Sequence, residues 1–106
     1  MPTLLDLADI SFPENLDGQS LVPILRGDKD AVRELLHAEH SICYDEQQGY
    51  HFLTDGKMKY IWRPANGAEQ LFDLEADPNE LSDLSSKPDR AAETSCWRNR
   101  LIECLK

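Results

Sequence analysis

The stretch that decides the fold is residues 50–74, Tyr-His-Phe-Leu-Thr-Asp-Gly-Lys-Met-Lys-Tyr-Ile-Trp-Arg-Pro-Ala-Asn-Gly-Ala-Glu-Gln-Leu-Phe-Asp-Leu. It is rich in aromatic residues, and the turn signals Asp55-Gly56 and Asn66-Gly67 divide it into three segments. Asp-Gly readily adopts the positive φ angles of a two-residue type I′ turn, whose twist suits antiparallel strands. The strands that this pattern predicts are residues 50–54, 57–63 and 69–74.

Further elements must support these strands, because a short hairpin is only marginally stable in water. Residues 35–44 show partial alternation of apolar and polar side chains, which predicts another strand. A last helix is expected from Pro88 or Asp89 to about Leu105. Its expected apolar stripe consists of Trp97, Leu101, Cys104 and Leu105. We therefore expect an α+β fold, a four-stranded antiparallel sheet with a long C-terminal helix packed on one face.

Short N-terminal helices are expected before the sheet. Residues 2–8 begin with a proline that suits the first helical turn. Ser20 is placed to cap a second helix over residues 21–25, and Gly27 is placed to end it. The first helix is apolar around much of its circumference, so we expect it to continue something longer.

The overall composition excludes several classes of partner. The chain has 106 residues, enough for one small core, and a formal net charge of −9. Its Lys and Arg residues are scattered, whereas nucleic acid and anionic membranes require clustered positive charge. We therefore expect neither a nucleic acid nor a membrane as a partner.

The three cysteines are Cys43, Cys96 and Cys104. An odd number at wide spacing predicts neither a disulfide framework nor a Cys-x-x-Cys zinc site. Cys96 and Cys104 are eight residues apart, so on one helix both are expected to face the core as small apolar groups.

Several phrases of the chain, taken in order, resemble the part of sulfatases that follows the catalytic core. Residues 1–10 read Met-Pro-Thr-Leu-Leu-Asp-Leu-Ala-Asp-Ile, and residues 16–27 read Leu-Asp-Gly-Gln-Ser-Leu-Val-Pro-Ile-Leu-Arg-Gly. Residues 53–62, Leu-Thr-Asp-Gly-Lys-Met-Lys-Tyr-Ile-Trp, and residues 69–80, Glu-Gln-Leu-Phe-Asp-Leu-Glu-Ala-Asp-Pro-Asn-Glu, resemble the C-terminal subdomain of that family. The resemblance covers nearly the whole chain.

This resemblance implies a sulfuric ester hydrolase with an alkaline-phosphatase-like core, a formylglycine made from Cys or Ser, and a divalent metal, usually calcium. The formylglycine motif of the family is Cys or Ser, any residue, Pro or Ala, any residue, Arg. The segment Cys96-Trp97-Arg98-Asn99-Arg100 has the Cys-to-Arg spacing but Arg98 at the Pro or Ala position. We expect neither the nucleophile nor the metal ligands in this chain, and no cofactor bound to it alone.

The resemblance also divides the chain. Residues 1–34 are expected to link from a catalytic core, and residues 35–106 to form the sulfatase C-terminal α+β subdomain. The subdomain is expected to pack on the core of the same polypeptide and to line the pocket for a sulfated small molecule or carbohydrate. Without that core it is expected to be inactive and to self-associate through the exposed core-facing surface.

The candidate site residues lie in His37-Ala38-Glu39-His40. In a strand His37 and Glu39 share one face and His40 the other, so the two histidines cannot bind one metal side by side, and no metal ligands are predicted. The segment matches the place where sulfatase tails approach the mouth of the active site. This implies that His40, and secondarily His37, contacts the substrate. His51 is interpreted as a surface residue.

Two alternatives remain open at this point. One is a free-standing module that binds a partner protein or ligand without catalysis, and the other is a truncated gene product without function. A module should be a monodisperse monomer or a symmetric dimer, whereas a subdomain without its core should self-associate. The apolar first helix favours the subdomain.

Overall fold

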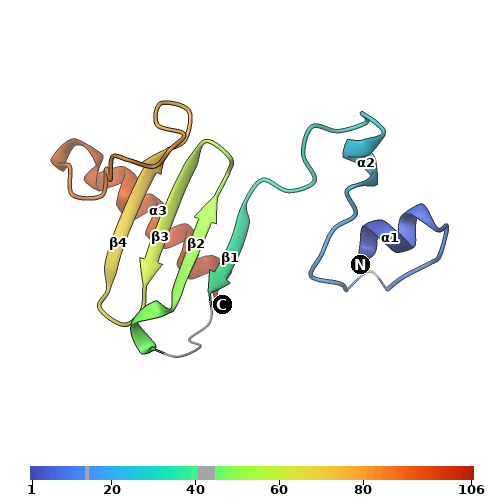
Figure 1. The fold of residues 1–106 in the computed structure, drawn as a ribbon, viewed down its shortest axis with the longest axis horizontal. Coiled ribbons are helices and arrows are strands. Elements are labelled where there is room, and N and C mark those ends of the chain that lie inside the picture. Colours follow the sequence, from blue (N-terminus) through green and yellow to red (C-terminus); the bar gives the residue numbers. More distant parts are fainter. Residues whose placement is uncertain (14, 41–44) are drawn as a thin grey trace. The chain divides into compact units, whose positions relative to one another are not determined.

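The computed structural model describes residues 1–13, 15–40 and 45–106, the side chain of residue 46 excepted. The chain divides into two compact units, Met1–Glu34 (unit 1) and Leu35–Lys106 (unit 2) (Figure 1). Across the described ranges, no helix combines the length and the apolar character that crossing a membrane requires.

Unit 1 contains two short helices, α1 (Pro2–Leu7) and α2 (Val22–Leu25). Hydrogen bonds between side chains and backbone connect them: Thr3 Oγ1 accepts from the amide of Leu21 at 3.1 Å. The expected cap of α2 is shifted, because Leu21 is the N-cap and the helix has no side-chain cap. Ser20, one residue earlier, still accepts from the amide of Val22 at 3.2 Å.

Unit 2 is built on a four-stranded antiparallel sheet in the order β1-β2-β3-β4, as the sequence predicts. The strands are β1 (Leu36–His40), β2 (Tyr50–Thr54), β3 (Met58–Arg63) and β4 (Ala68–Asp73). A short 3₁₀ turn, η1 (Glu46–Gln48), precedes β2. The part of the expected first strand at residues 41–44 lies outside the described residues.

The turn between β2 and β3 differs from the predicted type I′ turn. Of its two central residues only Gly56 has a positive φ, at 89°, whereas type I′ requires positive values at both. The Asp55 carboxylate instead accepts hydrogen bonds from the amides of Lys57 and Met58, at 2.9 and 2.8 Å. This side-chain bonding stabilises a longer connection, in which Thr54 pairs with Lys59.

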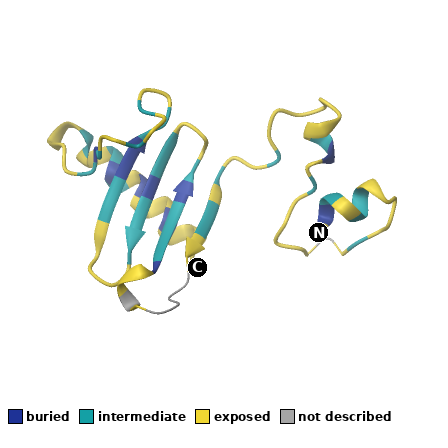
Figure 2. Cartoon of the chain, in the orientation of Figure 1, coloured by how far each residue is buried: buried dark blue, intermediate teal, exposed yellow. Residues whose placement is uncertain are grey.

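The long helix α3 (Ala91–Cys104), preceded by the 3₁₀ turn η2 (Pro88–Arg90), packs on one face of the sheet. The core between them consists of Leu53, Tyr60, Leu71, Leu84, Trp97 and Leu101 (Figure 2). The expected stripe of α3 is right for its first two members, Trp97 and Leu101, only. Its buried residues are Thr94, Trp97 and Leu101.

The C-terminal end of the expected stripe was wrong. Cys104 is exposed, Leu105 is 45% exposed, and Cys96 is exposed as well. The reason is geometric: the helix joins the buried core through Trp97 and Leu101, and every residue after Leu101 is exposed.

The two edges of the sheet differ. Along β4, Leu84 donates its amide to the carbonyl of Leu71 at 2.8 Å, and the Ser85 hydroxyl donates to the carbonyl of Glu69 at 3.0 Å. The segment after β4 thus covers that edge, which protects its backbone groups from further strand pairing. β1 forms the other edge, and the candidate residues lie on it.

Candidate functional site at the β1 edge

The register of β1 and β2 decides which side chains meet at this edge. Glu39 lies directly opposite His51, and His37 lies opposite Leu53, a core residue beneath α3. Side chains alternate between the faces of a strand, so His37, Glu39 and His51 all lie on the helix side of the sheet. His40 lies on the helix-free side, which confirms that His37 and His40 do not converge.

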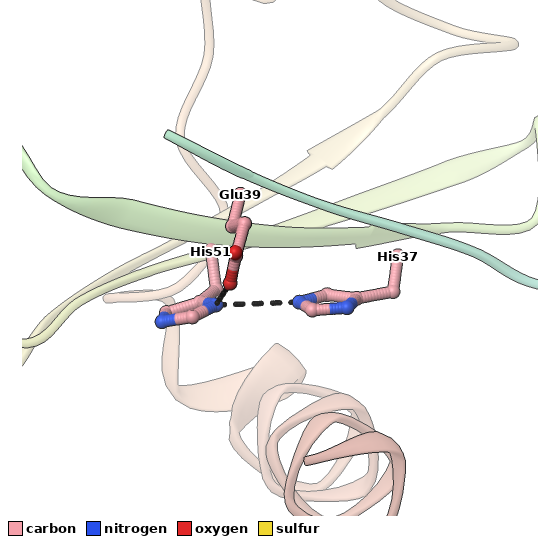
Figure 3. Close-up of side chains that lie close together, drawn as sticks. All are labelled: His37, Glu39 and His51. Carbon is pink, nitrogen blue, oxygen red and sulfur yellow. Dashed lines mark hydrogen bonds and ion pairs between the residues drawn. The ribbon is translucent and has the colours of Figure 1, made fainter. Parts of the chain in front are cut away.

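The three side chains on the helix side form a close cluster (Figure 3). Nε2 of His37 lies 3.3 Å from Nδ1 of His51, and the same Nδ1 lies 3.5 Å from Oε2 of Glu39. The two imidazole rings are stacked, with centroids 5.5 Å apart and an angle of 12° between their planes. One ligand atom from each of the three residues lies within 4.8 Å of the other two.

The ring of His51 contacts a tryptophan that packs on the core. Its ring stacks on Trp62 with a centroid distance of 5.7 Å, and Trp62 packs against the buried cluster beneath α3. The His51 side chain is 21% exposed, and Glu39 is 64% exposed. His51 is therefore half-buried and not fully exposed on the surface, because the strand register brings it onto the helix side of the sheet.

His40 has a different environment on the helix-free face. It is exposed, and its ring stacks on Tyr50 with centroids 5.4 Å apart. The guanidinium carbon of Arg63 lies 5.6 Å from the centre of the same Tyr50 ring. This places an imidazole, an aromatic face and a fixed positive charge together on three adjacent strands.

A third polar group joins α3 to the sheet. Arg98 donates two hydrogen bonds to the Glu69 carboxylate, at 2.5 and 2.6 Å, and the hydroxyl of buried Tyr60 donates to the same carboxylate. The pKa of Glu69 is lowered, mainly by the hydrogen bonds from Arg98. Burial, followed by the hydrogen bond to Glu69, raises the pKa of the Tyr60 hydroxyl. These bonds satisfy a buried hydroxyl, and their role is structural.

Calcium does not fit the donors that this chain gathers. Calcium takes about six to eight oxygen ligands. Within residues 1–13, 15–40 and 45–106, the one metal-capable group of three or more His, Cys, Asp or Glu side chains is His37, Glu39 and His51. Two of its three donors are nitrogens, so calcium in a sulfatase would need ligands from elsewhere.

The formylglycine pattern occurs once in its serine form, at Ser86-Lys87-Pro88-Asp89-Arg90, a match that our sequence interpretation overlooked. In the structure Ser86 is exposed in the turn before η2. Arg90 donates to the Glu93 carboxylate at 2.7 Å, and its carbonyl accepts from the Thr94 hydroxyl at 3.1 Å. These contacts make the segment the start of α3, and none of its residues belongs to the metal-capable group.

Comparison with known proteins gives the family. The family described as N-sulphoglucosamine sulphohydrolase, C-terminal, matches residues 1–106. An arylsulfatase of Clostridium perfringens is 37% identical over 106 residues, which is 100% of this chain and 21% of that protein. A choline-sulfatase of Rhizobium meliloti is 41% identical over 90 residues, covering 82% of this chain and 17% of that protein.

The solved structures agree with the sequence comparison. A structure described as a 2-O GAG sulfatase superimposes with a TM-score of 0.86 at 28% identity, over 98% of this chain and 23% of that one. The chain thus spans about a fifth of the length of such relatives, at their C-terminal part. It belongs to the sulfatase family whose C-terminal region is named after N-sulphoglucosamine sulphohydrolase.

Proposed function

We propose that this chain acts as the C-terminal subdomain of a sulfuric ester hydrolase, is inactive alone, and completes the substrate pocket of its catalytic core. The observation that carries the proposal is the family match over residues 1–106. In such a protein the core would supply a formylglycine nucleophile and calcium, which together attack and polarise the sulfate ester. The residues of this chain would position the subdomain and the substrate.

The apolar surface of unit 1 supports packing against a core. Unit 1 exposes a set of large apolar side chains, which is unusual for a segment of 34 residues. They are Met1, Leu4, Leu7, Ile10, Leu16, Leu21, Ile24 and Leu25. Burying such side chains contributes about 25 cal/mol per Å² of apolar surface removed from water. A catalytic core of the same polypeptide is the partner that we propose for this surface.

The helix-free face of the sheet at β1 supports a contact with an anionic substrate. Imidazolium and guanidinium groups donate strong hydrogen bonds to anionic oxygens, and an aromatic face packs on the apolar side of a sugar ring. His40, Tyr50 and Arg63 provide these groups together. His37 lies on the opposite face with His51, so His40 is our first candidate for a sulfated small molecule or carbohydrate and His37 the second.

Activity measurements test this proposal. The 106-residue chain and the complete protein that contains it, with its core, are compared in the hydrolysis of 4-nitrophenyl sulfate. We expect turnover by the complete protein and none by the isolated chain. The Ser86→Ala variant of the complete protein is a control, and it should retain full activity because Ser86 lies in a connecting turn. Hydrolysis by the isolated chain, or its loss in Ser86→Ala, would contradict the proposal.

A further inference from the structure

We propose that His37, Glu39 and His51 form a binding site for Zn²⁺ on the helix side of the β1 edge. This site is separate from His40, our first candidate for the substrate contact, because its ligands lie on the opposite face of the sheet. It also differs from our sequence prediction of no metal ligands. That prediction considered only neighbours within residues 37–40, whereas the third ligand comes from the paired strand.

The distances match a tetrahedral zinc centre. With Zn–N bonds of about 2.0–2.1 Å, two donor atoms of a tetrahedron lie about 3.3–3.4 Å apart. The distance from Nε2 of His37 to Nδ1 of His51 is 3.3 Å, and that from Nδ1 to Oε2 of Glu39 is 3.5 Å. Two of the three ligand pairs are therefore close to the spacing that a zinc ion requires, and the atoms of the third pair lie within 4.8 Å of each other.

The donor set also matches. Two imidazoles and one carboxylate are ligands that Zn²⁺ commonly takes, and a zinc ion held by three protein ligands keeps a fourth position open. Glu39 is 64% exposed, so an ion reaches the cluster from solvent without opening the core. The open position would take a water molecule or an anionic oxygen.

The protein scaffold brings the ligands close together before any ion binds. The cross-strand pair of Glu39 and His51 sets two of them, and stacking on Trp62 restrains the ring of His51. Such preorganisation reduces the loss of side-chain entropy on binding. A bound ion would tie the edge strand β1 to β2 and so stabilise the open edge of the sheet.

A hydrogen bond between the two imidazoles is the simpler explanation of the 3.3 Å contact, with one ring donating and the other accepting. It explains the spacing of His37 and His51 but predicts no affinity for a metal. The two explanations therefore differ in a quantity that can be measured directly.

The test is Zn²⁺ binding to the 106-residue chain by isothermal titration calorimetry, with Cys43, Cys96 and Cys104 replaced by serine to remove thiol ligands. We expect one ion per chain and a higher melting temperature in excess Zn²⁺, since a ligand of the folded state stabilises it. His37→Ala and Glu39→Gln should each weaken Zn²⁺ binding by about 10-fold to 100-fold or more. Losses of that size are typical even for residues that only hydrogen-bond to a metal ligand.

The matched control is His40→Ala, which removes a histidine of the same strand on the other face and should leave the affinity unchanged. Glu39→Gln keeps the shape of an exposed side chain, so lost binding there cannot be ascribed to unfolding. Co²⁺ substitution adds a readout: visible absorption bands of a tetrahedral nitrogen and oxygen site are expected. The proposal is overturned by absent binding, or by binding that survives His37→Ala and Glu39→Gln.

Discussion

His37 and His51 are diagonal neighbours across the β1–β2 pair, with Nε2 of His37 3.3 Å from Nδ1 of His51. Fourteen positions separate them in the sequence, and only the antiparallel register brings them together. His40, three residues from His37, instead stacks on Tyr50 on the other face. The edge of the sheet thus presents two chemically distinct sites, for which we propose a metal ion and an anionic substrate.

Replacing His40 tests the substrate contact. In the complete protein His40→Ala should raise KM for a sulfated substrate about 10-fold, equivalent to about 1.4 kcal/mol of binding, with a smaller change in kcat. Steady-state kinetics measure both constants. Lys57→Ala is a suitable control, since this lysine is exposed and its ammonium pairs with the Glu75 carboxylate at 3.6 Å. Equal KM values for wild type and His40→Ala would contradict a substrate contact.

The Glu69 carboxylate gives a pH prediction. Its pKa is lowered in the folded chain, first by the hydrogen bonds from Arg98, so the folded state binds its proton less readily than the unfolded state does. The stabilisation is therefore fully present above the unfolded pKa, about 4.3, and is lost as the pH falls through the lower folded value. Urea midpoints at pH 7 and pH 3, followed by tryptophan fluorescence, measure this loss.

Glu69→Gln should lower the free energy of unfolding at pH 7 by about 1–3 kcal/mol, because it weakens charge-assisted hydrogen bonds. It should also lose less stability than wild type between pH 7 and pH 3. The control is Glu103→Gln, which affects an exposed ion pair with Lys106 that is worth little. If Glu69→Gln and wild type lose the same stability between pH 7 and pH 3, the protonation of Glu69 does not contribute to the acid sensitivity of the fold.

The packing of α3 on the sheet depends on a few fully buried side chains. Leu53 is 0% exposed, and Leu53→Ala should lower the free energy of unfolding by about 2–5 kcal/mol through lost apolar contact and a residual cavity. Leu81 is 82% exposed, and Leu81→Ala should change the free energy of unfolding by less than about 0.5 kcal/mol. Urea denaturation measures the free energy of unfolding of both variants. Similar losses in Leu53→Ala and Leu81→Ala would contradict the position of Leu53 in the core.

Unit 1 should make the isolated chain self-associate. Leu4 and Leu25 are 65% and 68% exposed, so a variant with both replaced by serine should shift the chain toward a monomer. Sedimentation velocity over a range of concentrations measures the shift, and Leu81→Ser on unit 2 is the control. A wild-type chain that stays monomeric throughout would favour a free-standing module over a subdomain.

Much of the sheet follows from local sequence. The aromatic segments 50–54 and 57–63 with an intervening Asp-Gly predict a hairpin whatever surrounds them, and β2 and β3 lie there. The exact turn does not follow, because the Asp55 carboxylate bonds to the amides beyond it and selects a longer connection. Local propensity gives the presence of a turn more reliably than its type.

The candidate cluster illustrates what sequence patterns leave out. The alternation within residues 37–40 correctly separates the two histidines of β1. His51 enters the cluster through the strand register, which local sequence patterns do not give. The helix stripe failed at Cys104 for a related reason, since the part of a helix face that is buried depends on tertiary packing and not on periodicity alone.

The most direct test of the account is the coding sequence immediately upstream of the Met1 codon, read in frame. A C-terminal subdomain predicts an uninterrupted frame that continues into a catalytic core, with a Cys or Ser, any residue, Pro or Ala, any residue, Arg motif and acidic metal ligands. A stop codon followed by a ribosome-binding signal directly before Met1 would contradict it. The chain would then be a protein in its own right without a sulfatase core.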